Sequence, residues 1–295
     1  GDVYKRQTTK RLAASSDQTI EQRAYWAQRL SIRLSDVGAQ EQALGSGREA
    51  VELYESLVKN SPDDYEKDLA AVLDHLAANL NAVGEFREAL VAGQKSVEQY
   101  RRLFSKSPEL STQDLAIALT NLAKYRLEAW ELVDALEAAQ EAVDLQRRLC
   151  AESPDKYTLG LANSLVALAN SLLTLGDEAK SLAAAREASD LIRELYNESQ
   201  ASYALPLVAA LDTLSHCLSA SGDSCGALRA AREAERLHRW LVKESPSARL
   251  TDFAYSLNNL AHCLLKNGEY GDAVAVCCEA EVIFRELSEK YPQVH

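Results

Sequence analysis

Apolar residues follow one another along the chain at the spacing of an α-helix. Leu69, Leu73, Leu76 and Leu80 are separated by four, three and four residues, so they form one stripe on a helix with 3.6 residues per turn. Gly84 comes next, and glycine commonly supplies the left-handed residue that ends a helix. A second stripe runs from there to the next Ser-Pro pair, where it stops because the residue before proline disfavours the helical conformation. The pattern predicts a hairpin of two helices.

This hairpin pattern recurs every 46 residues. The column of Leu76 comprises Leu30, Leu76, Leu122, Leu168, Leu214 and Leu260. The column of Gly84 comprises Gly38, Gly84, Trp130, Gly176, Gly222 and Gly268. Two columns of small residues comprise Ala43, Ala89, Ala135, Ser181, Ala227 and Ala273, and Ala50, Ser96, Ala142, Ala188, Ala234 and Ala280. Such self-similarity predicts a repeat protein, with repeats at 17–62, 63–108, 109–154, 155–200, 201–246 and 247–292 and a non-native or disordered leader at 1–16.

The start of the first helix in each repeat has two readings. Ser-Pro at 61–62 resembles a helix cap followed by proline at the first helical position. However, Pro206 stands in the column of Asp68, and a proline in a helix interior costs about 3 kcal/mol. We therefore expect this helix to start near residue 68, after an extended connector at 62–67. Tyr65 and its equivalents, Tyr157 and Tyr203, are then expected to pack against the hairpin.

A single hairpin of this size cannot bury its apolar face, whereas stacked hairpins can. The two columns of small residues would let neighbouring helices approach closely. Stability would then come from contacts between adjacent repeats.

The spacing of Leu76-Ala77, Gly84, Ala89 and Ser96 resembles the signature of the tetratricopeptide repeat. The standard unit has 34 residues, and the segment 252–260 followed by Gly268 resembles a longer variant. Arrays of that variant occur in fungal and actinobacterial proteins, often beside nucleotide-binding NB-ARC ATPases or caspase-like CHAT domains. The resemblance implies an all-α fold, a right-handed α-solenoid of six antiparallel helix hairpins with a TPR-like superhelix. Trp130 departs from the glycine of the signature.

The charge of the chain limits the kinds of partner that it can bind. With a net charge of −12, the chain lacks the basic surface that binding to phosphates requires. Nucleic acid and anionic membranes are therefore not expected as partners. No apolar run approaches the roughly 18 residues of a membrane span, and the N-terminus has no hydrophobic signal segment. The protein is therefore expected to be cytoplasmic, with reduced cysteines.

No catalytic motif is recognisable in the sequence. The recurring glycines lie 46 residues apart, whereas phosphate-binding loops need clustered ones. Neither Gly-x-Ser-x-Gly nor His-Glu-x-x-His is present. We expect no enzyme activity, no cofactor and no metal.

Three features allow more than one interpretation. His216-Cys217 and His262-Cys263 share columns, and one interpretation is that they converge on zinc, but neighbouring helical residues diverge by about 100°. Buried cysteines with groove-facing histidines are preferred. The pair at 277–278 is read as core packing rather than a redox pair. Trp130 is read as filling space rather than as an exposed contact residue.

The groove is expected along the first helices, as the resemblance implies. Counting back from Gly84 gives its candidate residues: Tyr25, Gln28, Asp74, Asn81, Thr120, Lys124, Asn163, Asn170, Asp212, His216, Tyr255, Asn258, His262 and Lys266. Asparagine and glutamine both donate and accept, so they suit an extended peptide backbone. The scarcity of cations among these residues favours a neutral or mildly basic ligand.

The leading hypothesis is a scaffold that binds a peptide or protein segment in the concave groove. The alternative is a regulatory array within a larger signalling ATPase or CHAT protease. Solenoids need polar capping helices, and the last repeat has none after Tyr291, so self-association through uncapped terminal repeats is also expected.

Overall fold

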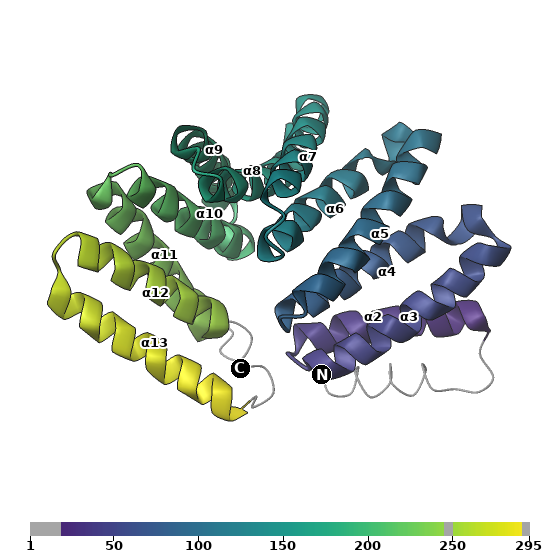
Figure 1. The fold of residues 1–295 in the computed structure, drawn as a ribbon, viewed down its shortest axis with the longest axis horizontal. Helices are drawn as coiled ribbons and strands as arrows, with labels where there is room; N and C mark the ends of the chain where they lie inside the picture. The colour runs from purple at the N-terminus through teal and green to yellow at the C-terminus, as the bar shows by residue number, and fades with distance from the viewer. Residues whose placement is uncertain (1–18, 245–249, 291–295) are drawn as a thin grey trace. The chain divides into compact units, whose positions relative to one another are not determined.

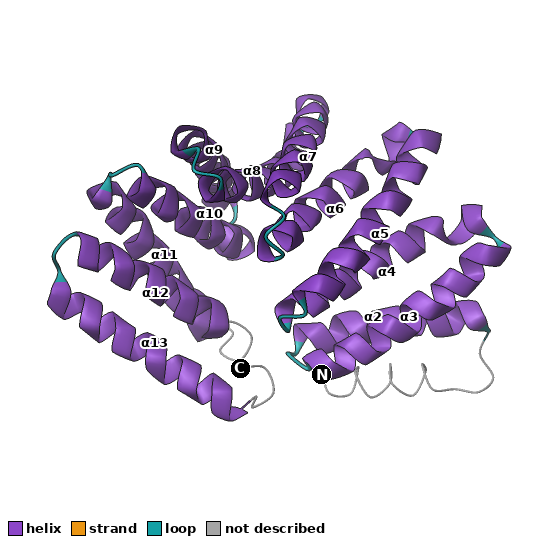
Figure 2. Cartoon of the chain, in the orientation of Figure 1, coloured by secondary structure: helices purple, strands orange, loops and turns teal. Residues whose placement is uncertain are grey.

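The computed structural model describes residues 19–244 and 250–290, and helices account for nearly all of them (Figure 2). The described part contains no strand, which confirms the all-α prediction. The predicted leader at 1–16 lies outside the described residues. The helices are α2 (Ile20–Asp36), α3 (Gln40–Asn60), α4 (Pro62–Ala82), α5 (Phe86–Lys106), α6 (Pro108–Glu128), α7 (Leu132–Glu152), α8 (Pro154–Thr174), α9 (Glu178–Glu198), α10 (Gln200–Ala220), α11 (Ser224–Glu244), α12 (Leu250–Lys266) and α13 (Tyr270–Lys290).

The chain forms two compact units, residues 1–131 with α2–α6 and residues 132–295 with α7–α13. In each unit, every helix packs against the next one in the sequence (Figure 1). The first helices of consecutive repeats also contact one another, α2 with α4 and α4 with α6 in the first unit, and α8 with α10 and α10 with α12 in the second. Contacts within a unit therefore join only adjacent repeats, as stacking predicts. Among the described helices, none is long and apolar enough to cross a membrane.

The predicted helix starts are wrong. Residues 62–67 are not an extended connector but the first turns of α4, which begins with Pro62 directly after the N-cap residue Ser61. Proline is favoured there because its missing N–H would have no partner within the helix. Pro206 does lie inside α10. The neighbouring Ala204 and Leu207 are completely buried, and this packing outweighs the lost backbone bond.

The turn between the two helices of a repeat uses a left-handed residue. Gly84 has φ 84°, and the amide of Glu85 donates to the carbonyl of Leu80 at 2.9 Å. Trp130 takes the same conformation at φ 63°, and the backbone amide of Glu131 donates to the carbonyl of Arg126 at 2.8 Å. The prediction that Trp130 fills space is wrong, because its side chain is 80% exposed.

The two columns of small residues lie where helices touch, and every member is buried. Serine takes the place of alanine where its hydroxyl can donate to a backbone carbonyl of the facing helix. Ser96 Oγ donates to Ala70 O, and Ser181 Oγ donates to Ala169 O, both at 2.9 Å. Gly93 shows how close the helices are, because a Cβ added there would lie 2.7 Å from the ring of Tyr125.

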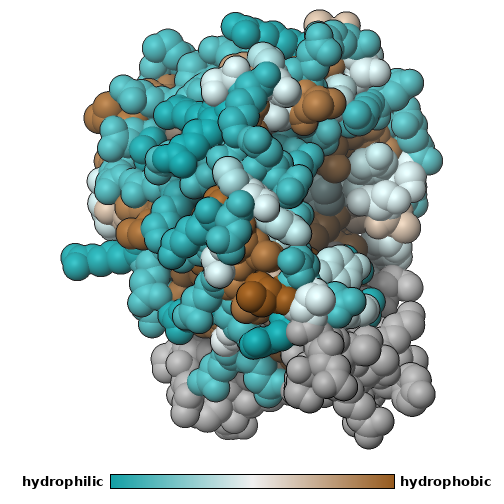
Figure 3. Space-filling model, turned by 90° about the vertical axis from the view of Figure 1, so that its right-hand side faces the viewer, coloured by the Kyte–Doolittle hydropathy of each residue, from teal (hydrophilic) through white to brown (hydrophobic). Residues whose placement is uncertain are grey.

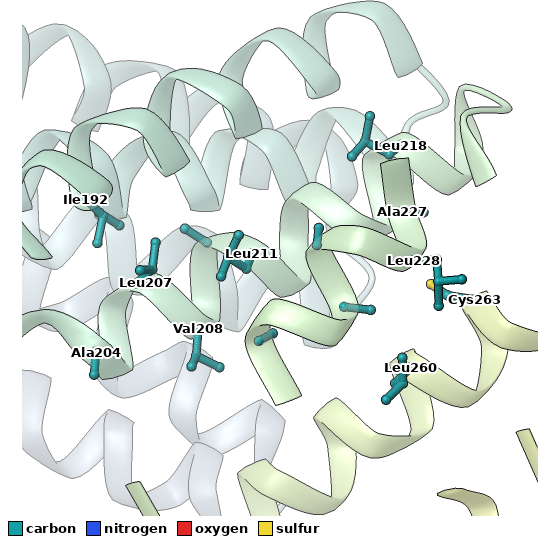
Figure 4. Packing of buried hydrophobic residues seen from close by; sticks show 14 of the residues in the cluster. Ile192, Ala204, Leu207, Val208, Leu211, Leu218, Ala227, Leu228, Leu260 and Cys263 are labelled. Carbon is teal, nitrogen blue, oxygen red and sulfur yellow. The ribbon is translucent and has the colours of Figure 1, made fainter. Parts of the chain in front are cut away.

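Larger apolar residues fill the space between these contacts. In the second unit, Ile192 of α9, Leu207 and Leu211 of α10, and Leu228 of α11 belong to one buried cluster (Figure 4). Cys263 of α12 belongs to the same cluster. The core therefore runs continuously through successive hairpins rather than being closed within each.

Ion pairs connect the second helices of consecutive repeats. Arg147 pairs with Glu187 at 2.8 Å, Arg193 with Glu233 at 2.6 Å and Arg239 with Glu279 at 2.6 Å. Each pair spans 40 residues and uses the same two columns. In the first unit, the pair in these columns is reversed, with Glu55 facing Lys95 at 3.9 Å. We call these contacts the second-helix ladder.

The left-handed turn at Trp130 leads to a prediction about stability. Replacing Trp130 by glycine should raise the free energy of unfolding by about 1 kcal/mol, measured by urea denaturation. A non-glycine residue in this conformation costs about 1–2 kcal/mol of strain. Glycine removes this strain but loses more conformational entropy on folding, so only part of the gain appears in the stability. Gly84→Ala is the matched control and should lower the free energy of unfolding by about 1 kcal/mol, because alanine is strained in the left-handed conformation. No clash adds to this cost, since the added Cβ would meet nothing within 4 Å. A W130G chain less stable than the native one would contradict the prediction.

Candidate functional site

The predicted groove residues lie on the first helices, α2, α4 and α6 in the first unit and α8, α10 and α12 in the second. Those exposed to solvent are Tyr25, Lys124, Asn163, His216, Tyr255, Asn258, His262 and Lys266. Those partly exposed are Gln28, Asp74, Asn81, Asn170 and Asp212. Thr120 is the exception, because its side chain is buried and its hydroxyl donates to Ala116 O of the same helix at 2.8 Å. Contrary to the prediction, Thr120 is therefore not accessible to a ligand. We call the remaining residues the first-helix face.

Two charged residues of the first-helix face in the first unit are partly shielded from water by the surrounding protein. Lys124 is exposed, yet burial by surrounding protein lowers the pKa of its amino group, and Asp74 only partly offsets this effect. Burial likewise raises the pKa of Asp74, against a hydrogen bond from Asn121.

Asp74 and Asp212 occupy the same column and hold consecutive first helices together. Asn121 Nδ2 donates to the carboxylate of Asp74 at 3.1 Å, and Asn259 Nδ2 donates to that of Asp212 at 2.9 Å. Both asparagines lie 47 residues after their partner. Sequence analysis missed these contacts, although the shared spacing would have indicated them. Both carboxylates therefore have a structural role on the first-helix face.

Asp212 also belongs to a hydrogen-bonded chain of three side chains. Ser256 Oγ donates to Asp212 at 2.5 Å and lies 2.9 Å from His238 Nδ1. Because the serine proton is directed to Asp212, Nδ1 of His238 donates to Ser256. A hydrolase needs the opposite order, with histidine accepting the serine proton and the carboxylate behind it. Ser256 is also buried, so this chain stabilises the packing of α10, α11 and α12.

The His-Cys columns separate as the preferred reading expects. Cys217 and Cys263 are buried, and burial raises the pKa of both thiols. Their sulfurs lie 2.9 Å from Ser181 Oγ and 3.2 Å from Ser215 Oγ. His216 and His262 point to solvent on the first-helix face. Within residues 19–244 and 250–290, no three His, Cys, Asp or Glu side chains are arranged to hold a metal ion.

The expected packing of Cys277 and Cys278 is wrong, because both side chains are exposed. In the preceding repeat, the columns of Val274 and Cys277 hold Leu228 and Ala231, which are buried. Val274 and Val282 are 62% and 56% exposed. Together with Cys278 they form an apolar stripe on α13 at intervals of four residues. We call this stripe the α13 face.

On the face drawn in Figure 3, apolar side chains are dispersed. Figure 3 shows a face on which hydrophilic residues predominate and hydrophobic ones form separate patches. Tyr25 and Tyr255 are among the exposed aromatic residues and stand at corresponding positions of α2 and α12. Tyr25 contacts Trp26 edge to face with ring centroids 5.1 Å apart, and Tyr255 contacts Phe284 in the same way at 5.5 Å. These contacts orient both rings.

No protein-family model and no curated protein matches the chain. Solved structures match it at low sequence identity. BtubC from P. vanneervenii is 17% identical, with a TM-score of 0.60 over 85% of this chain and 92% of that one. A Rap protein complexed with Competence and Sporulation Factor is 16% identical, with a TM-score of 0.60 over 98% of this chain and 78% of that one. The putative kinesin light chain TPR-like repeats of Podosopora anserina are 14% identical, with a TM-score of 0.51 over 75% and 97%. The chain thus has a tetratricopeptide-like helical-repeat fold.

His216 makes the stability of the chain depend on pH. Burial is the main cause that lowers its pKa, His262 adds to this effect, and Asp212 opposes it. In the unfolded chain His216 has a pKa of about 6.5, so as the pH falls the unfolded chain takes up the proton before the folded chain does. The free energy of unfolding therefore decreases as the pH falls below about 6.5. Compared with His216→Gln, the native chain should lose free energy of unfolding between pH 7.5 and pH 5.5. Urea denaturation of both chains measures this, and a difference that stays constant with pH would contradict it.

Proposed function

We propose that the chain is a protein-interaction scaffold that binds an extended peptide segment along its first-helix face. The observation that carries the proposal is the recurrence of solvent-accessible amide or aromatic side chains on four of the first helices, α2, α4, α8 and α12. In the second unit, Asn163 and Asn170 of α8 and Tyr255 and Asn258 of α12 belong to this face. The fold of the Rap protein that is complexed with Competence and Sporulation Factor supports the same class of function.

The chemistry of the face favours a ligand read mainly through its backbone. Each amide offers both a donor and an acceptor, so a row of amides can hydrogen-bond successive peptide groups. Tyr25 and Tyr255 add apolar contact area at a low cost in conformational entropy. Asp74 and Asp212 are balanced on this face by Lys124 and Lys266, so we infer a neutral segment.

A regulatory array within a larger signalling ATPase or CHAT protease is the alternative function. The resemblance of 252–260 to repeats found beside such domains favours it. In that case, the first-helix face would bind a segment of the same polypeptide. The complete reading frame distinguishes the two, because a nucleotide-binding or protease motif beside the repeats would support the regulatory function.

Truncation of amide side chains tests the first-helix face. For a peptide selected by display on the full chain, Asn170→Ala or Asn258→Ala should each weaken binding by about 1–3 kcal/mol, the cost of an unpaired buried group. Isothermal titration calorimetry measures the affinity. Asn197→Ala is the control, since Asn197 is exposed on the second helix α9. Unchanged affinity after replacing Asn163, Asn170, His216 and Asn258 together would place the ligand elsewhere.

The α13 face supports a second part of the proposal, association of two copies of the chain. Val274, Cys278 and Val282 are spaced symmetrically about Cys278. An antiparallel α13 of a second copy would place each valine against the other valine and Cys278 against its counterpart. It would thereby cover Val274, whose column holds the buried Leu228 in the preceding repeat, and also Cys278 and Val282, whose columns hold the exposed Arg232 and Arg236 there.

Sedimentation under reducing conditions tests this association. The native chain should form a dimer, and the double variant V274E/V282E should be monomeric, because four glutamates would then meet in an apolar interface. A bismaleimide that links two thiols should cross-link the native chain and the C225S variant but not C278S. Cys225 is a suitable control because it is also exposed. A native chain that stays monomeric at high concentration contradicts the association.

A further inference from the structure

Trp130 occupies the left-handed position of its turn at a cost to the fold. Its φ is 63°, a conformation that is strained for a bulky side chain, and the other five repeats have glycine in this column. The side chain is 80% exposed, so burial within the chain does not offset the strain. Strained residues cluster at functional sites, and tryptophan is enriched among the residues that contribute most to protein interfaces. Trp130 is therefore a candidate contact residue for another molecule.

The turns of the first unit bring further apolar side chains to the same edge. As the first helices of successive antiparallel hairpins, α2, α4 and α6 run in the same direction, and α4 contacts both of the others. Their C-terminal ends therefore lie along one edge of the unit. Val37 after α2 and Phe86 at the start of α5 are 46% and 39% exposed there. We call this edge the turn edge, and it comprises residues 33–42, 79–88 and 125–131.

The turn edge carries an excess of carboxylates. It contains six acidic residues, three arginines and no lysine. Two of the carboxylates pair with arginines, Glu88 with Arg48 of α3 at 2.8 Å and Glu131 with Arg126 at 3.8 Å. The others are exposed and form no ion pair in the described part of the chain, namely Asp36, Glu41, Glu85 and Glu128. Even when the two remaining arginines of the edge are set against these four, the turn edge keeps a net negative charge.

An exposed indole beside carboxylates suits a cationic partner. The face of an aromatic ring attracts cations, and tryptophan does so more strongly than tyrosine or phenylalanine. A guanidinium group is better suited than an ammonium group, because it is planar and can stack on the ring. Its N–H groups then remain free to bind a carboxylate through two parallel hydrogen bonds. Glu128, two residues before Trp130, is a carboxylate of this kind.

We propose that the turn edge of the first unit binds an arginine-rich segment of another protein. One arginine of the segment stacks on Trp130, and others pair with Glu85 and Glu128. Apolar side chains of the segment contact Val37 and Phe86. None of these residues belongs to the first-helix face, so the inference does not rest on the proposed function.

A synthetic peptide of the sequence Gly-Ser-Arg-Leu-Arg-Leu-Arg-Ser-Gly, labelled with fluorescein, is a suitable probe. Titration with the full chain, followed by fluorescence anisotropy, should show saturable binding. The affinity should fall when NaCl is raised from about 50 to about 300 mM, because salt screens exposed charges. Trp130→Gly should weaken binding at least tenfold. Since glycine relieves the strain at this position, such a loss does not come from unfolding of the variant.

Matched variants separate the turn edge from the overall charge of the chain. The double variant E85Q/E128Q should weaken binding about fivefold or more. The control E194Q/E198Q removes the same charge at two exposed glutamates of α9, and Trp240→Ala removes another exposed indole, from α11. Both controls should leave the affinity within twofold. Circular dichroism confirms that each variant is folded.

Unchanged affinity of the W130G chain would overturn the proposal, as would equal losses for the two double variants or the absence of saturable binding. Equal affinity for a probe with citrulline, an uncharged analogue, in place of arginine would also overturn it. If the native chain bound phosphatidylcholine vesicles but not the peptide, and W130G bound neither, Trp130 would belong to a lipid-binding surface instead.

The outcome also distinguishes this inference from the proposed function. Loss of peptide binding on replacing Asn163, Asn170, His216 and Asn258 together, but not on replacing Trp130, would place the probe on the first-helix face. That result would overturn this inference and leave the proposed function standing.

Discussion

Close approach of helices at the small-residue columns is the constraint on which this fold depends. Ala50 and its equivalents are buried where helices touch, and any larger side chain there would separate them. Beside these columns, Gly93 leaves little room in its own repeat, since a single added carbon would lie 2.7 Å from the ring of Tyr125. Because interiors are packed as densely as organic crystals, the spacing set by these columns determines where every larger side chain lies. The core, the second-helix ladder and the bonds of Asp74 and Asp212 all follow from that spacing.

The sequence predicted the features that recur in every repeat. The apolar stripes and the small-residue columns each appear in all six repeats, so their periodicity is far stronger than any local preference. The glycine turns were likewise predictable, because only the left-handed conformation explains glycine at one column in five repeats. A feature that is present once carries no such support. Pro206 is an example, since its known cost in a helix misled the assignment of all the first-helix starts, whereas buried packing around Ala204 and Leu207 overrides that cost.

The candidate site was only partly predictable for the same reason. Counting columns placed most of the expected side chains on the solvent side of the first helices. It could not show that Thr120 is buried. The position of a residue on a helix gives the direction of its side chain but not which neighbouring residues cover that side chain. It also could not find the hydrogen-bonded chain of Asp212, Ser256 and His238, whose members come from three different helices. Such information exists only in three dimensions.

The second-helix ladder has a consequence for how such a chain can change by recombination between its own repeats. Equal repeat lengths allow whole units to be lost without shifting the helical register. Loss of the unit 155–200 would place Arg147 opposite Glu233, and the attraction would be kept. Loss of the unit 63–108 would place Glu55 opposite Glu141, and two carboxylates would face each other. The reversed pair between Glu55 and Lys95 therefore marks the first two repeats as a matched set, and the remaining repeats can be shortened or extended behind it.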